Sequence, residues 1–113
     1  MGDPSLRLVL TSLDDADAAA AIARTLVEER LAACVNVVPG AHSIYRWKGA
    51  LETAHEHLLL IKTTALAWPR LERRLRELHP YELPEIVVLA SCDADAAYAR
   101  WIGESVDPDA TGL

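Results

Sequence analysis

The sequence predicts one domain of the α+β class, and three observations support this. Short apolar or alternating runs predict strands, two longer segments have apolar residues at helical spacing, and 113 residues are enough for a single packed core. Hydrophobic residues make up 51% of the chain and charged residues 25%, which is typical of a folded globular protein. We expect one domain over residues 1–113, ordered from about residue 6 to about residue 106.

The first strand and the first helix are predicted between residues 6 and 31. Residues 6–12 alternate, with leucines at positions 6, 8 and 10 on one face. Asp14 and Asp15 follow and can cap the N-terminus of a helix. In the alanine-rich segment the apolar residues from Ala19 to Leu26 lie along one side of a helix, and Arg30 falls on the same side. We therefore expect the helix to end near residue 31.

A long β-hairpin is predicted from about residue 32 to residue 64. Its first strand is interrupted at Pro39-Gly40, because proline lacks the N–H that a strand ladder needs, and Lys48-Gly49 is typical of a tight turn. A hairpin of this length cannot lie wholly against a core of this size, so its tip should project and expose Tyr45 and Trp47. Exposed aromatic residues on such a ribbon favour a subunit interface, with a ligand-stacking platform as the alternative.

The second half of the chain predicts a helix, a strand and a short last helix. A helix starting at Trp68-Pro69 should end before Pro80, and the run of residues 85–90 is apolar on both faces, which predicts an internal strand. Asp93 and Asp95 should begin the last helix. Its expected anchors are Tyr98, Trp101 and Ile102. The order β-α-β-β-α-β plus a helix predicts a ferredoxin-like fold, with one antiparallel sheet and both main helices on one face.

Composition and motifs exclude several functional classes. The net charge is -6 and the pI is near 5.1, which argues against nucleic acid as a partner. The apolar runs are too short to span a bilayer and residues 1–15 do not resemble a signal peptide, so we expect a cytoplasmic protein without a membrane partner. No nucleophile elbow, phosphate-binding loop or H-E-x-x-H motif is present, and we expect no enzymatic activity. Cys34 and Cys92 are expected to be reduced thiols.

Three histidines of the hairpin form one candidate metal site. His55 and His57 are two residues apart on a strand and therefore point to the same side. If Lys48-Gly49 closes a two-residue turn, counting outward places His42 opposite His55, provided that no bulge intervenes. Three imidazoles on one face could bind a borderline or soft divalent ion, and the alternative is a solvated surface ladder.

The stretch "ELHPYELPEI", residues 77–86, forms a second candidate site. It holds His79, Tyr81, Glu82 and Glu85 between two prolines, next to the last predicted strand. Rigid loops at strand ends often carry ligands. His79 could equally cap the C-terminal end of the preceding helix, where a cation is favoured.

Several segments together resemble the CutA family of divalent-cation tolerance proteins. They are "ERLAACVNVVPGAHSIYRWKGALE", "LLLIKTT", "HPYELPEIVVL" and "YARWI", in the family's order, and the resemblance covers about residues 6–106. It implies a ferredoxin-like homotrimer, similar in shape to the PII signalling proteins, in which the long hairpins pack against neighbouring subunits. It also implies a non-enzymatic role in tolerance of copper and other divalent ions.

The resemblance also implies where a metal would bind. The family's copper-binding pattern uses a cysteine at the end of the first strand and two successive histidines before the Pro-Tyr pair. This chain has Thr11 and Leu78 at two of those positions, and only His79 remains. A hydroxyl and a leucine cannot replace a thiolate and an imidazole as ligands of a soft ion.

Two functions follow as hypotheses. In the first, the chain forms a homotrimer of divalent-metal homeostasis, and His79 and Glu82 bind copper or another divalent ion in an inter-subunit pocket with Tyr81 and Glu85. Folding is not expected to require the metal. In the second, the trimer is a PII-like sensor or scaffold whose clefts hold a small anionic ligand. The cationic residues available for that ligand are Lys62, Arg46 and Lys48.

Overall fold

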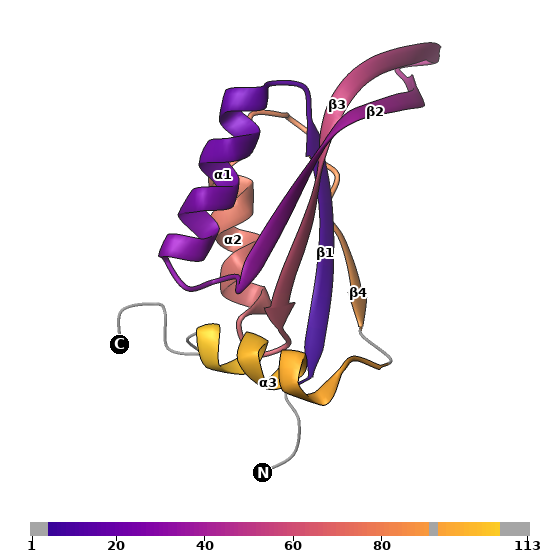
Figure 1. Ribbon diagram of the computed structural model, residues 1–113. Helices are drawn as coiled ribbons and strands as arrows, with labels where there is room; N and C mark the ends of the chain where they lie inside the picture. Colours follow the sequence, from indigo (N-terminus) through magenta and orange to yellow (C-terminus); the bar gives the residue numbers. More distant parts are fainter. Residues whose placement is uncertain (1–4, 91–92, 107–113) are drawn as a thin grey trace.

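The computed structural model describes residues 5–90 and 93–106. In chain order its elements are β1 (Leu6–Leu13), α1 (Ala16–Glu28), β2 (Cys34–Trp47), β3 (Ala50–Thr64), α2 (Trp68–Leu78), β4 (Val87–Ala90) and α3 (Ala96–Ser105). The four strands form one antiparallel sheet in the order β2-β3-β1-β4 (Figure 1). This is the ferredoxin-like arrangement, and the predicted fold class is confirmed.

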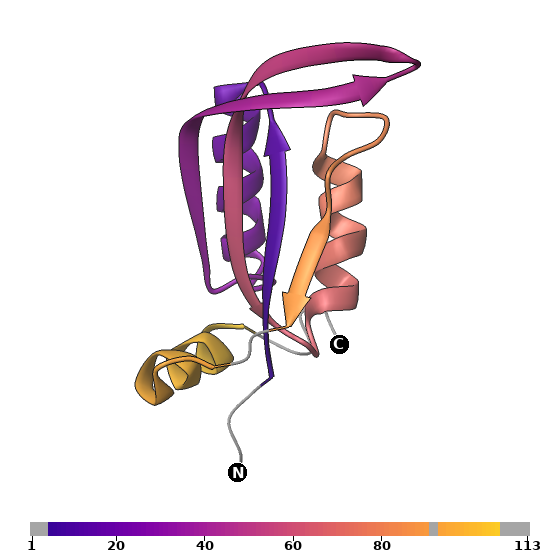
Figure 2. The same ribbon diagram turned by 90° about the vertical axis from the view of Figure 1, so that its right-hand side faces the viewer.

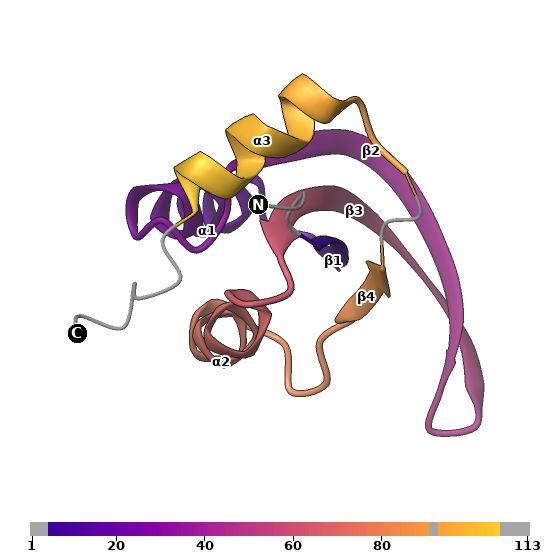
Figure 3. The same ribbon diagram turned by 90° about the horizontal axis from the view of Figure 1, so that it is seen from below.

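Helices α1 and α2 lie side by side on one face of the sheet, as Figure 3 shows in the view from below. The core lies between these helices and strands β1 and β3. Its fully buried large residues are Val9, Leu13, Leu26, Leu59, Ile61, Leu71 and Leu75. The core residues of β1, Val9 and Leu13, are four positions apart, and those of β3, Leu59 and Ile61, are two positions apart. The spacing is even because only every second side chain of a strand points toward the helices.

Helix α1 begins where the sequence predicts and ends earlier than expected. The side chain of Asp15 accepts hydrogen bonds from the N–H groups of Asp17 and Ala18 at 2.9 and 3.1 Å, and thereby satisfies two donors of the first turn. The expected extension to residue 31 is wrong. Arg30 has a φ of 60°, in the left-handed region that ends helices, so it does not continue the apolar stripe.

The β2–β3 hairpin has the predicted turn and the predicted interruption. Lys48 and Gly49 have φ values of 50° and 82°, as a two-residue turn of the I′ type requires, and Trp47 pairs with Ala50. The register shifts by one between Val38 and Ala41, so a bulge lies at the Pro39-Gly40 position. The hairpin projects beyond the helices and arches over the loop between α2 and β4 (Figure 2).

Strand β4 is an edge strand, and its predicted internal position is wrong. It is four residues long and pairs with β1 alone. Val87, Val88 and Leu89 are 45%, 38% and 47% exposed. The apolar pattern of residues 85–90 predicts burial on both faces, but within the described residues the chain supplies no strand beyond β4.

Helix α3 is anchored by small and aliphatic residues rather than by its aromatic ones. Ala99 and Ile102 are buried, and Ile102 packs with Val106 against the end of the sheet. Tyr98 and Trp101, two of the three expected anchors, are 42% and 44% exposed and stack on each other with ring centroids 5.4 Å apart. Ala99 lets the helix approach closely on the face that the aromatic residues do not occupy.

The face of the sheet opposite α1 and α2 is apolar and largely uncovered. The register places Leu8 beside Leu89, and Leu10 beside Leu60 and Val87. These side chains alternate with the core residues, so they point away from α1 and α2. Among the described elements only α3 packs on this side, at the end of the sheet where Leu6 lies (Figure 3).

Candidate functional site

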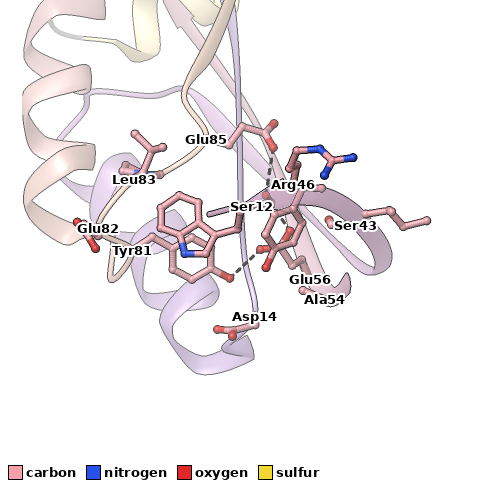
Figure 4. Close-up of a pocket in the computed structure, with 14 residues that line it drawn as sticks. Ser12, Asp14, Ser43, Arg46, Ala54, Glu56, Tyr81, Glu82, Leu83 and Glu85 are labelled. Atoms are coloured by element: carbon pink, nitrogen blue, oxygen red, sulfur yellow. Dashed lines mark hydrogen bonds between the residues drawn. The ribbon is translucent and has the colours of Figure 1, made fainter. Parts of the chain in front are cut away.

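A cleft of about 820 Å³ lies between the projecting part of the hairpin and the loop that follows α2. Its walls are Ser12 and Asp14 at the end of β1, residues 43–47 of β2, Glu56 of β3, and the loop residues 81–85 (Figure 4). The projecting hairpin and the proline-held loop therefore create the cleft together, since neither element alone encloses a space.

Glu56 is a buried carboxylate in the wall of this cleft and is 7% exposed. The Tyr81 hydroxyl donates to its Oε2 at 2.7 Å, and the Ser12 hydroxyl lies 3.3 Å from its Oε1. Burial acts to raise the pKa of Glu56, but hydrogen bonds from Ser43, Tyr81 and Ser12 outweigh it, so the pKa is lowered. Glu56 is therefore an anion held inside the protein.

Tyr81 is a permanent hydrogen-bond donor to Glu56. Burial raises the pKa of its hydroxyl, and the hydrogen bond to Glu56 and the charges of Glu56 and Asp14 raise it further. The phenol consequently stays protonated at neutral pH and can only donate to the carboxylate (Figure 4).

Glu85 brings a second carboxylate to the same hydroxyl. The Ser12 Oγ lies 3.2 Å from the Glu85 Oε1 as well as 3.3 Å from Glu56, and Figure 4 shows the hydroxyl between them. A serine hydroxyl has one proton and can donate to only one carboxylate at a time. The Ser12 hydroxyl thus bridges two acidic side chains, and a cation bound between them would be attracted to both.

The charged side chains of the cleft are mostly acidic. Four carboxylates line it, those of Asp14, Glu56, Glu82 and Glu85, and Arg46 is the cation among the lining residues that the structure describes. Glu82, one of the two predicted metal ligands, is exposed and points away from the Glu56–Tyr81 contact in Figure 4. The charge balance favours a cationic ligand over an anionic one.

His79, the other predicted metal ligand, uses both ring nitrogens within the chain. The backbone N–H of Tyr81 donates to its Nδ1 at 3.1 Å, so Nδ1 is the acceptor and Nε2, 3.0 Å from the carbonyl oxygen of Ser12, carries the proton. Its own backbone N–H donates to the carbonyl of Leu75 and ends α2. Burial lowers the pKa of His79, although the Ser12 carbonyl and Glu56 act in the opposite direction. His79 is thus a neutral helix-end residue without an available lone pair.

The copper pattern implied by the family resemblance is therefore incomplete in space as well as in sequence. Thr11 is fully buried, and its Oγ1 has no hydrogen-bond partner within the described part of the chain. Leu78 packs against the core. These residues supply one hydroxyl and an occupied imidazole, which do not suit a soft ion.

The hairpin histidines are brought together in part. His42 pairs with His55 as predicted, and their rings stack with centroids 4.9 Å apart and an interplanar angle of 14°. His57 pairs with Leu13 of β1, and its buried Nδ1 has no hydrogen-bond partner among the described residues. Across residues 5–90 and 93–106 no three His, Cys, Asp or Glu side chains form a group suited to a metal ion.

The cationic residues proposed for an anionic ligand are dispersed. The Lys62 Nζ lies on the uncovered sheet face, where it contacts the Asn36 Oδ1 and is 4.0 Å from the Cys34 Sγ. The Lys48 Nζ lies over the ring of Trp47, 5.7 Å from its centroid. Arg46 alone of the three lines the cleft.

Tyr45 and Trp47 do reach the surface, as predicted, and are 44% and 38% exposed. Both also line the cleft. Whether another subunit or a ligand covers them stays a prediction. Cys34 is a half-buried free thiol, and Cys92 lies outside the described residues.

Sequence reasoning missed Glu56, the most buried acid of the cleft. The signal was an acidic residue two positions before the apolar run of residues 58–61. It lies between His55 and His57, so its side chain points to the opposite face of the strand. Its partners Ser12 and Tyr81 are 44 and 25 residues away in the chain, so no local pattern links them.

Together these features define a small ferredoxin-like α+β protein with a cleft lined by four carboxylates and an uncovered apolar sheet face. No described helix is long and apolar enough to cross a membrane. The CutA1 family model, described as the CutA1 divalent ion tolerance protein, matches residues 7–105. The chain belongs to this family.

Individual relatives agree with that assignment. The chain is 49% identical over 98 residues to the divalent-cation tolerance protein CutA of Thermus thermophilus, covering 87% of this chain and 95% of the relative. It is 43% identical over 95 residues to the mouse protein CutA, covering 81% of this chain and 54% of that protein. The crystal structure of CutA from Xylella fastidiosa superposes with a TM-score of 0.88 at 42% identity, covering 94% of this chain and 100% of that one.

Proposed function

We propose that this chain is a non-enzymatic divalent-cation tolerance protein that acts as a homotrimer and binds divalent metal ions in its acidic cleft. The observation that carries the proposal is the Glu56–Ser12–Glu85 contact, in which two carboxylates share one hydroxyl inside a cleft with four acids. The names of the relatives, divalent-cation tolerance proteins, support the same function.

The ligand chemistry of the cleft favours hard ions. Carboxylate and hydroxyl oxygens suit Mg²⁺, Ca²⁺ or Mn²⁺, with water completing the coordination shell, whereas copper prefers nitrogen and sulfur donors. Glu56 and Glu85 are the residues that would hold the ion, and Tyr81 and Ser12 fix the orientation of Glu56. His79 enters this proposal as a residue that positions the loop, not as a ligand, because both of its ring nitrogens are occupied.

The homotrimer is supported by the apolar surface that a single chain leaves open. Leucines of β1 and β3 face away from α1 and α2, and β4 adds exposed Val87 and Leu89 at the edge of the sheet. A continuous apolar face beside an open strand edge is typical of a subunit interface. Sedimentation velocity at low micromolar concentration tests this assembly, and a folded, stable monomer would contradict it.

Titration with Mn²⁺, followed by calorimetry, tests the cleft. We expect Glu56→Gln and Glu85→Gln each to weaken Mn²⁺ binding by about tenfold or more, because each removes one of the two central carboxylates. Glu28→Gln is the matched control, since it removes the same charge from an exposed position on α1. Equal affinities in all four proteins would refute binding at the cleft.

The alternative of a sensor for small anions has less support, because the described lining residues include four carboxylates and one cation, Arg46. A thermal-shift screen with nucleotides and organic acids separates the two functions. A ligand of the native state raises the melting temperature. A rise with anions and none with Mn²⁺ would favour the sensor.

A further inference from the structure

We propose that His42 and His55 form a second metal site, a cross-strand histidine pair on the hairpin that chelates Zn²⁺, Ni²⁺ or Cu²⁺. The inference deepens the proposed role in metal tolerance and rests on it for its biological meaning. The site is physically separate from the acidic cleft, so the two can be tested independently. Neither histidine is among the residues that line the cleft.

The register of the hairpin puts the two imidazoles at a position where side chains approach closely. The two-residue turn makes Trp47 and Ala50 the hydrogen-bonded closing pair, and pairs then alternate along the ribbon. His42 and His55 are the sixth pair, counted from Trp47–Ala50 as the first, so they occupy a non-hydrogen-bonded position. There the Cα atoms are about 4.5 Å apart, closer than the roughly 5.5 Å of a hydrogen-bonded pair.

The separation of the rings matches that of two imidazoles on one ion. With a metal–nitrogen distance of about 2.0–2.1 Å, and about 1.1 Å from nitrogen to ring centre, the centroids lie about 4.5–5.2 Å apart for nitrogen–metal–nitrogen angles of about 90–110°. The centroids of His42 and His55 are 4.9 Å apart. The rings now lie nearly parallel, at 14°, so binding requires a rotation about χ2, which is a soft torsion.

Both rings are available for such a rotation. His42 and His55 are exposed, and within the described part of the chain neither ring donates or accepts a hydrogen bond. His79 is the opposite case, since two backbone groups hold its nitrogens inside the fold. Availability of the lone pair therefore distinguishes the hairpin pair from the histidine that the family resemblance indicates.

The chemistry of the pair selects a metal class different from that of the cleft. Neutral imidazole suits Zn²⁺, Cu²⁺ and Ni²⁺, whereas carboxylate oxygens suit Mg²⁺, Ca²⁺ and Mn²⁺. Alternation along the ribbon turns His55 to the face opposite Ala54 and Glu56, which line the cleft. One hairpin thus presents nitrogen ligands on one face and oxygen ligands on the other.

Calorimetric titration with Zn²⁺ tests the pair in the purified full-length chain. We expect one Zn²⁺ per chain at a site that His42→Gln and His55→Gln each weaken by about tenfold or more, because either change removes the chelate. Thr53→Ala, an exposed change on the same ribbon, is the matched control and should bind Zn²⁺ as the wild type does. Unfolding without metal checks that the variants keep their fold.

Two further measurements test the histidine pair separately from the cleft: the spectrum of bound Cu²⁺, and the Mn²⁺ affinity of the Glu56→Gln variant. Electron paramagnetic resonance of bound Cu²⁺ should show coupling to two imidazole nitrogens in the wild type and to fewer in either histidine variant. If Zn²⁺ binding is unchanged in both histidine variants, the pair is refuted, whatever Mn²⁺ does at the cleft. If the histidine variants lose Zn²⁺ while Glu56→Gln keeps its Mn²⁺ affinity, the pair is supported and the cleft proposal fails. If the wild type binds neither ion, both fail.

Discussion

The Tyr81→Phe substitution isolates the contact that holds a charge inside the cleft. It removes a hydroxyl that donates to the Glu56 Oε2 at 2.7 Å and leaves the rest of the side chain in place. A hydrogen bond to a charged group contributes about 1.5–3 kcal/mol, and Glu56 is buried, so solvent cannot readily replace the lost donor. We expect the variant to lose about 1.5–3 kcal/mol of unfolding free energy at pH 7.

The pH dependence of this loss identifies its cause. Because the folded protein lowers the pKa of Glu56 below its ordinary value of 4.5, the stabilisation is present above that value and is lost as the pH falls through the folded pKa. Removing a donor that lowers this pKa should therefore matter at pH 7 and matter less as the pH falls below 4.5 toward the folded pKa. The difference in unfolding free energy between wild type and variant should therefore shrink as the pH is lowered.

Urea unfolding at one fixed protein concentration and several pH values measures the effect. A fixed concentration is needed because stability depends on concentration in an oligomer. Tyr98→Phe is the control. Tyr98 is 42% exposed and stacked on Trp101, so loss of its hydroxyl should change the free energy of unfolding by less than about 0.5 kcal/mol. An equal loss for Tyr81→Phe at pH 7 and pH 3 would show that the hydroxyl does not act through the charge of Glu56.

Three further predictions concern stability. Burial lowers the pKa of His79, so the native state resists protonation and wild-type stability should fall as the pH drops below the ordinary histidine value of 6.5; His79→Gln should flatten this dependence in the same urea assay. Leu75→Ala should lose about 2–5 kcal/mol in thermal or urea unfolding, because the side chain is fully buried between α2 and the sheet. Gly49→Ala should lose about 1 kcal/mol, since φ is +82° there and no atom lies within 4 Å of an added Cβ, so backbone strain alone acts; no loss would contradict the turn assignment.

The parts of the fold that depend on local chemistry could be predicted from the sequence. Lys48-Gly49 fixed the turn, and counting outward from it correctly placed His42 opposite His55, because the bulge lies farther from the turn, between Val38 and Ala41. Pro80 correctly marked the end of α2, and the first acids after β1 correctly marked the start of α1. Each of these signals acts over a few residues.

The parts that depend on long-range packing could not be predicted. Apolar residues on both faces of β4 indicate that both faces need cover, but they do not say whether the cover comes from the same chain, and β4 proved to be an edge strand. Tyr98 and Trp101 have the size of core residues, yet the buried residues of α3 are Ala99 and Ile102. Glu56 acquires its role from residues of β1 and of the loop after α2, which meet it only in the folded chain.

The bulge at Pro39-Gly40 connects the fold to both proposed metal sites. Between Val38 and Ala41 the strand β2 gains one residue relative to β3, so Pro39 and Gly40 together stand opposite His57. If β2 kept all its residues and continued in the register of residues 34–38 without a bulge, His42 would pair with Ala54 instead of His55. The cross-strand imidazole pair therefore requires both the turn that sets the upper register and the bulge that absorbs its mismatch with the sheet below. The same bulge accompanies the bend that carries the hairpin over the loop after α2 (Figure 2). Residues of that hairpin and of that loop together line the cleft.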